Sequence, residues 1–286
     1  VDLLGHLAAQ AERRQRDQQL EQARQELQSA AEKVRVSVEK LGDSKLSGEL
    51  AKLAEAADRS GPDDVRRQAV RRLGDLAEEM KRMRASPDNA GTEATREMLK
   101  KLRAGREGPA GELDRALARS DFREAAEQAR KLREQVREAN LSDEARQALA
   151  EQLEKLTRQL EGLADEARCR REALADAGLD EALAELDDEQ LPEALKDQGL
   201  TDEQVRQLLE KMDAQRRACE ALGRLTKSTG RCGRCAGAGE LTEAELAELI
   251  ERQHELEAAE GRLTLLEEGL DDIEDAVALL GAGQGG

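Results

Sequence analysis

A leucine-rich pattern that repeats every seven residues runs through residues 242–280, the last long segment of the chain. Two positions of the repeat, three residues apart, stay apolar over more than three heptads. They hold Leu256, Leu263, Leu270 and Val277 at one position, and Ala259, Leu266, Ile273 and Leu280 at the other. Such spacing buries one stripe of a helix against a neighbouring helix. It therefore predicts a long helix that packs lengthwise on a partner helix.

The composition favours helices along the rest of the chain as well. Apolar and charged residues each make up 38% of the 286 residues, and the chain has one phenylalanine and no tryptophan or tyrosine. The four commonest residues, Ala, Leu, Glu and Arg, form helices readily, as does the frequent Gln. Similar stripes run from Leu20 to Leu41 and from Ala145 to Ala167. We therefore predict an all-α fold of elongated antiparallel helical hairpins, or coiled coils, joined by short helices.

Three short corners of similar sequence indicate where the chain turns back. They are Asn140-Leu141-Ser142, Gly178-Leu179-Asp180 and Gly199-Leu200-Thr201. Gly or Asn can adopt the left-handed conformation that ends a helix, Leu folds back on that helix, and Ser, Asp or Thr caps the next one. Thr242 and Glu245 form a fourth cap, of the capping-box type. Tight corners of this kind favour antiparallel hairpins over one continuous rod.

Breaks in the pattern suggest how the chain is divided. Residues 86–91, rich in Pro, Asp, Asn and Gly, predict a loop and a domain boundary. The expected regions are 1–85 with one long and several short helices, 92–199 with central hairpins, and 200–280 with a C-terminal hairpin whose apex is a loop at 229–240. Residues 281–286 are mostly glycine and predict a flexible tail. Because position 1 is Val and the chain ends in this tail, we expect it to be a segment of a longer protein.

A pair of cysteines gives the chain its most distinctive chemical motif. Residues 232–239 read Cys-Gly-Arg-Cys-Ala-Gly-Ala-Gly, and a CxxC turn offers two thiolates, half of a tetrahedral zinc site. The motif resembles one copy of the CxxCxGxG repeat of DnaJ-type chaperones, and its place at a hairpin apex resembles the zinc hook of SMC-related repair ATPases. Both resemblances imply zinc as a possible cofactor bound by Cys232 and Cys235. A redox dithiol, or a loop without chemistry, is the alternative interpretation.

The remaining cysteines and histidines suggest no second site. Cys219 falls on a helix seam, where a small packing residue is expected. Cys169 lies in the sequence Arg-Cys-Arg-Arg, and nearby cations lower a thiol pKa. His6 and His254 have no ligand-type neighbours beyond ordinary glutamates, so a histidine-based catalytic or metal centre is not expected. No glycine-rich phosphate loop follows a strand either.

Charge constrains the partners. The net charge is −17, and residues 240–286 hold fourteen acids and two arginines, which disfavours binding to nucleic acid or to anionic lipid. Residues 62–106 are mildly basic, and Arg66, Arg67, Arg71 and Arg72 lie at helical spacing. No apolar run is long enough to insert into a membrane. The cysteines have no framework of short spacings, which weakly favours the cytoplasm over an oxidising compartment.

These observations support three hypotheses for function. The first is a non-enzymatic coiled-coil protein that mediates self-association or docks a partner helix. Its expected interface residues are Leu249, Leu256, Leu263, Leu266, Leu270, Ile273 and Val277. The facing helix is either residues 202–227 of the same chain, which we favour, or residues 242–280 of a second copy. The second hypothesis is a zinc-binding module at the CxxC apex, and the third is a nucleic-acid accessory that uses residues 66–106.

Overall fold

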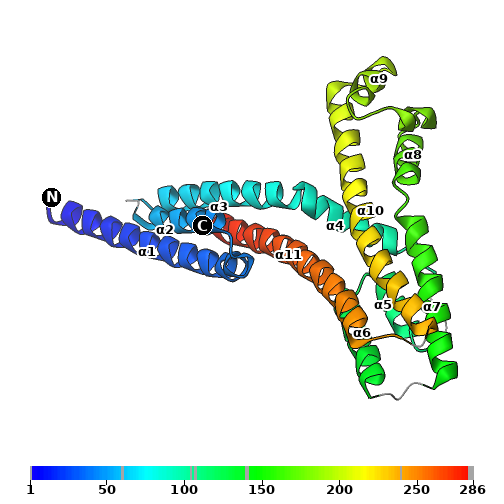
Figure 1. Cartoon of the computed structure of the whole chain (residues 1–286). Coiled ribbons are helices and arrows are strands. Elements are labelled where there is room, and N and C mark those ends of the chain that lie inside the picture. Colours follow the sequence, from blue (N-terminus) through cyan, green and yellow to red (C-terminus); the bar gives the residue numbers. More distant parts are fainter. Residues whose placement is uncertain are drawn as a thin grey trace. The chain divides into compact units, whose positions relative to one another are not determined.

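The computed structural model describes residues 2–58, 61–103, 105, 108–138, 142–238 and 240–282. These residues form eleven α-helices and two short 3₁₀ helices, with no strand among them, which confirms the all-α prediction. They divide into two compact units, whose helices Figure 1 labels. Unit 1 lies within residues 1–85 and 261–286, and unit 2 lies within residues 86–260. The last helix, α11 (Glu243–Ala282), contributes residues to both units.

Unit 1 is built from three helices and the second half of α11. Its elements are α1 (Asp2–Leu41), α2 (Ser44–Ala54), the 3₁₀ helix η1 (Glu55–Asp58), α3 (Pro62–Arg84) and residues 261–282 of α11. Figure 1 shows α3 and the red end of α11 running beside α1. Large apolar side chains fill the core between them, including Leu27, Val34, Leu73, Met80, Leu266 and Ile273. The heptad stripes of α1 and α11 therefore meet in one core.

Polar contacts reinforce this packing. The Ser37 hydroxyl of α1 donates to a carboxylate oxygen of Asp272 on α11 across 2.6 Å. Arg66 of α3 places its Nε 2.9 Å from the carboxylate of Glu26 on α1, and both side chains are largely buried. Breaking a buried pair of this kind leaves an uncompensated charge, so it specifies one register of α1 on α3.

Unit 2 is organised around one long helix. Its elements are α4 (Pro87–Leu99), α5 (Gly111–Ala118), α6 (Phe122–Arg137), α7 (Asp143–Leu163), α8 (Glu166–Asp176), the 3₁₀ helix η2 (Glu181–Glu185), α9 (Leu191–Asp197), α10 (Asp202–Gly237) and residues 243–260 of α11. The C-terminal half of α10 runs beside α7, and its middle packs on α4. Phe122, the largest buried side chain, lies in the core that α4, α5, α6, α7 and α10 share.

Small residues allow α10 to approach its neighbours closely. Gly230, Gly233 and Gly237, spaced three and four residues apart, face α7. A Cβ atom at Gly233 would lie 3.3 Å from the Leu153 Cβ and 3.4 Å from the backbone nitrogen of Glu154. A Cβ atom at Gly91 of α4 would lie 2.8 Å from the Cβ of Arg217 on α10. Unit 2 therefore packs its central helices almost backbone to backbone.

Two of the predicted corners are confirmed. Gly178 and Gly199 adopt φ angles of +72° and +88°, and the backbone amides of Leu179 and Leu200 donate back to the preceding helices. Thr201 caps α10 as predicted, and Gln204 completes a capping box with it. The other corner begins at Asn140 and Leu141, which lie outside the described residues, although Ser142 does cap α7 through the Ala145 amide.

Several predicted boundaries are wrong. Residues 86–91 form no loop, because Pro87 occupies the first turn of α4, where a missing N–H costs nothing. The first segment of unit 1 does end at Ala85 and unit 2 begins at Ser86, where the domain boundary was predicted. The helix expected from Ser142 to Ala177 is interrupted at Ala164 and Asp165, where Asp165 caps α8 by accepting from the Arg168 amide. Residues 200–280 are not one hairpin domain, because α11 passes from unit 2 into unit 1 at residue 261. Of the glycine tail, residues 283–286 lie outside the described residues.

Candidate functional site

The CxxC motif lies inside a helix, not on an apex loop. The loop predicted at 229–240 is wrong because α10 continues to Gly237, and its glycines face α7. The Cys232 side chain is fully buried, and its thiol donates to the backbone oxygen of Glu245 on α11 across 3.4 Å. Burial raises the pKa of Cys232 to about 12. Cys235 lies on the same helix and is half-buried.

These two thiols do not gather further ligands. Among the described residues, no group of three or more His, Cys, Asp or Glu side chains is placed to hold a metal ion. Zinc also requires thiolates, and a buried thiol with a raised pKa gives up its proton reluctantly. The zinc site therefore stays a prediction from the motif alone.

The predicted seam residues of α11 divide between the two units. Leu249 is buried in the core of unit 2, and Leu263 is buried as well. Leu266 and Ile273 are buried in the core of unit 1, where Leu270 and Val277 pack as half-buried side chains. Leu256 is half-buried and packs against the edge of the unit 2 core.

The expected facing helix is only partly right. Just beyond the predicted 202–227, near the end of α10, the helices α10 and α11 do pair: Arg231 forms an ion pair with Glu248 across 2.6 Å, and the Ser228 hydroxyl also contacts that carboxylate. Beyond residue 261, however, α11 packs on α1 and α3. Lys33 and Arg84 form ion pairs with Asp275 and Glu267, in addition to the Ser37 contact. A heptad pattern shows that a helix has a partner, but it does not identify that partner.

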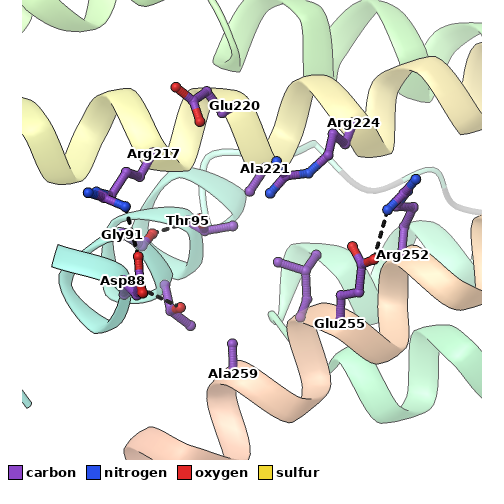
Figure 2. Close-up of a pocket in the computed structure, with 12 residues that line it drawn as sticks. Asp88, Gly91, Thr95, Arg217, Glu220, Ala221, Arg224, Arg252, Glu255 and Ala259 are labelled. Atoms are coloured by element: carbon purple, nitrogen blue, oxygen red, sulfur yellow. Dashed lines mark hydrogen bonds and ion pairs between the residues drawn. The ribbon is translucent and has the colours of Figure 1, made fainter. Parts of the chain in front are cut away.

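An open cleft of about 290 Å³ lies in unit 2 between α4, α10 and α11 (Figure 2). Two predicted seam residues, Leu256 and Ala259, line it together with Ala221 of α10, and all three are half-buried. On the α4 side the cleft is lined by Gly91, and the Thr95 hydroxyl donates to the Gly91 carbonyl across 2.8 Å. The stripe of α11 that is covered elsewhere is thus uncovered at this point.

Charged side chains surround this apolar strip. Arg217 pairs with Asp88 across 2.7 Å, and Arg252 pairs with Glu255 across the same distance. Arg224 makes no ion pair with any described residue, and Figure 2 shows its side chain extending beside Ala221. Glu220 points away from Ala259 in the same view. The cleft therefore combines an apolar strip with two charged side chains, Arg224 and Glu220, that form no ion pair with any described residue, and its Arg224 side suits an apolar side chain flanked by a carboxylate.

No local pattern in the sequence marks the arginines of the cleft. They come from two helices, and the acid that pairs with Arg217 lies on a third, 129 positions away. No local spacing connects such residues. Of the residues that line the cleft, the heptad pattern marked only the seam positions Leu256 and Ala259.

The basic stretch at 66–106 has few free cations. Arg66, Arg67 and Arg72 pair with Glu26, Asp64 and Asp75. A hollow of about 340 Å³ between α2 and α3 is lined by charged residues, among which Lys45 and Arg82 both pair with Glu79. Positive charge that is paired in this way offers little to a phosphate backbone.

The histidines and the other two cysteines have specific surroundings. His6 is exposed on α1. His254 lies between Glu257, 2.9 Å from its Nδ1, and Arg130, 2.6 Å from its Nε2.

Cys219 is buried as expected, but its sulfur lies 3.4 Å from that of Cys169, a proximity that the sequence did not predict.

None of the described helices combines the length and the apolar character that a membrane span requires, in agreement with the sequence prediction.

A scan against models of known protein families finds no match. Searches of curated proteins and of solved structures likewise find no significant match to the chain.

Proposed function

We propose that the chain is a non-enzymatic helical protein that associates through helix packing, with the cleft of unit 2 as its docking site. The observation that carries the proposal is the uncovered stretch of the α11 seam. Leu256 and Ala259 continue a stripe that is buried on both sides of them, yet they line an open cleft. Half-exposed apolar positions beside an arginine are typical of interface centres.

The favoured occupant is a helix of a second copy. The end of α11 exposes Leu279, 37% accessible, on a face that also carries Glu268, Asp271 and Asp275. These positions follow one another at three, four and four residues, so they share one side of the helix. An apolar anchor with carboxylates beside it complements the Arg224 side of the cleft. Lys33 already contacts Asp275, but Glu268 and Asp271 make no ion pair with any described residue.

Sedimentation velocity of the purified chain tests the proposal. We expect the mean mass to rise from low to high micromolar concentration at low salt, and to fall when salt screens the charges. Arg224→Glu should weaken the association about tenfold, because it sets like charges against each other. Lys227→Glu, on the same helix but outside the cleft, is the matched control and should have little effect.

Two outcomes would contradict the proposal. A chain that sediments as a monomer at every concentration does not associate with itself. A dimer that tolerates Arg224→Glu as well as Lys227→Glu uses another surface.

The two alternatives are not strengthened by any specific contact. Metal analysis of protein purified without chelator tests the zinc module, and about one zinc per chain or per dimer would favour it. A salt-dependent mobility shift of nucleic acid by the chain would favour the nucleic-acid accessory.

A further inference from the structure

Two cysteines that lie fifty positions apart meet in unit 2. Cys169 is on α8 and Cys219 is on α10, and their sulfur atoms are 3.4 Å apart. The backbone oxygen of Leu163, where α7 ends, accepts from Cys169 across 3.5 Å and lies 4.0 Å from the Cys219 sulfur. A disulfide needs about 2.05 Å between the sulfurs, so the two side chains have to approach by little more than 1 Å.

The two thiols differ in their surroundings. Cys169 is half-buried, whereas Cys219 is buried. The hydrogen bond from Cys219 lowers the pKa of Cys169, and that same contact together with burial raises the pKa of Cys219. The flanking arginines are not the cause, because Arg168 pairs with Glu172 and Arg170 with Asp188. Cys169 is thus placed to attack first, and Cys219 is placed to follow.

We propose that Cys169 and Cys219 form a reversible intramolecular disulfide by exchange with a low-molecular-weight disulfide such as oxidised glutathione. The Cys169 thiolate attacks one sulfur of that disulfide, forms a mixed disulfide and releases one thiolate. Cys219 then loses its proton to water and attacks the Cys169 sulfur, which releases the second thiolate. The external disulfide takes up the two electrons and becomes two thiols, while the two protein thiols become one disulfide.

The bond would close the region that holds the smallest apolar cluster among the described residues. The chain between the two cysteines contains most of α8, all of η2 and α9, and the first half of α10. Its own apolar cluster has five buried residues, Leu174, Leu191, Leu195, Val205 and Leu208. A cluster of this size opens at low free energy, and closing its ends with a covalent link restricts the open state. Oxidation would therefore stabilise the region from 169 to 219 against local opening.

Peptide mapping of the full chain tests the proposal. The protein is equilibrated with mixtures of oxidised and reduced glutathione and quenched in acid, and the free thiols are then alkylated with N-ethylmaleimide in denaturant, where all four cysteines are accessible. We expect the chain to lose two of its four alkylatable thiols. Cleavage after glutamate should yield residues 167–172 linked to residues 211–220, and dithiothreitol should reverse the link. Limited proteolysis between residues 177 and 201 should slow in the oxidised form.

Single variants separate the two roles. Cys219→Ser should accumulate a stable glutathione adduct on Cys169, because nothing resolves the mixed disulfide. Cys169→Ser should leave Cys219 unmodified. Cys235→Ser is the matched control and should form the 169–219 link at the wild-type glutathione ratio. A wild-type chain that retains four alkylatable thiols, carries only the Cys169 adduct, or links other cysteine pairs would overturn the proposal.

Discussion

The two units differ in the size of the side chains that lie between their packed helices. Unit 1 separates α1, α3 and the end of α11 with Leu, Val, Ile and Met side chains. Unit 2 brings α10 against α7 and α4 with Gly, Ala and Thr at the contacts. Large side chains stabilise by the area they bury, whereas small ones stabilise by letting many backbone atoms touch. The difference predicts that unit 1 is sensitive to truncation and unit 2 to enlargement.

The largest expected effect is truncation in unit 1. Leu266→Ala should cost about 2–5 kcal/mol of unfolding free energy, because Leu266 is fully buried and the substitution leaves a cavity. Urea denaturation followed by circular dichroism measures it. Glu274→Ala, at an exposed position of the same helix, is the control and should change stability by less than about 0.5 kcal/mol. Equal losses at the two positions would show that the end of α11 is not packed as described.

Enlargement in unit 2 should have the next largest effect. Gly233→Leu should destabilise by about 1–3 kcal/mol, because its side chain has to displace Leu153 and the backbone of α7. Gly223→Ala, on the same helix, meets nothing within 4 Å and should stabilise the helix by about 0.5–1 kcal/mol. Thermal melting of both variants measures the contrast. A Gly233→Leu chain as stable as the parent would contradict the close approach of α10 and α7.

A buried amide provides a smaller test. Gln253 in the unit 2 part of α11 is fully buried, and neither polar atom of its side chain has a partner among the described residues. Gln253→Met keeps the shape and removes the unsatisfied groups, so it should stabilise by about 1 kcal/mol. Gln147→Met, at an exposed position of α7, should be close to neutral. Denaturation midpoints compare them, and a destabilised Gln253→Met would show that the amide does have a partner.

The last prediction concerns the Cys232 thiol, which should have no effect on the pH dependence of stability near neutral pH and should reduce stability only in alkali. The pKa of Cys232 is about 12 in the folded chain, against about 8.5 for a free thiol. The folded state therefore keeps a proton that the unfolded state loses, so this contribution to stability is complete below about pH 8.5 and is lost towards pH 12. Mass spectrometry after iodoacetamide treatment at pH 8 should find Cys235 modified and Cys232 intact. Equal modification of the two thiols would show that small side chains do not keep water from this part of α10.

Sequence reasoning succeeded where one helix alone determines the outcome. Gly178, Gly199 and Thr201 act within a few residues, so the corners and caps could be predicted. The stripe through Leu27 and Val34 likewise identified the buried face of α1. These features depend on local geometry and on helical periodicity.

Sequence reasoning failed where the outcome depends on what lies opposite. Gly230, Gly233 and Gly237 suggested a loop because glycine weakens an isolated helix, but the approach of α7 compensates for that cost. Gln253 is buried although it interrupts the apolar stripe. The arginines of the cleft and the meeting of Cys169 with Cys219 require helices far apart in the sequence, and no single-segment pattern contains them.

The division of α11 between two units also sets an order of assembly during synthesis. Residues 86–260 are all made before the end of α11 emerges, so unit 2 has its whole core available early. Unit 1 does not, because Ser37 finds its partner Asp272 only 235 residues later. Contacts of such separation close late, since the loop between them must first be restrained. The core of unit 1, whose helices α1 to α3 precede unit 2 in the chain, is therefore expected to be completed after that of unit 2.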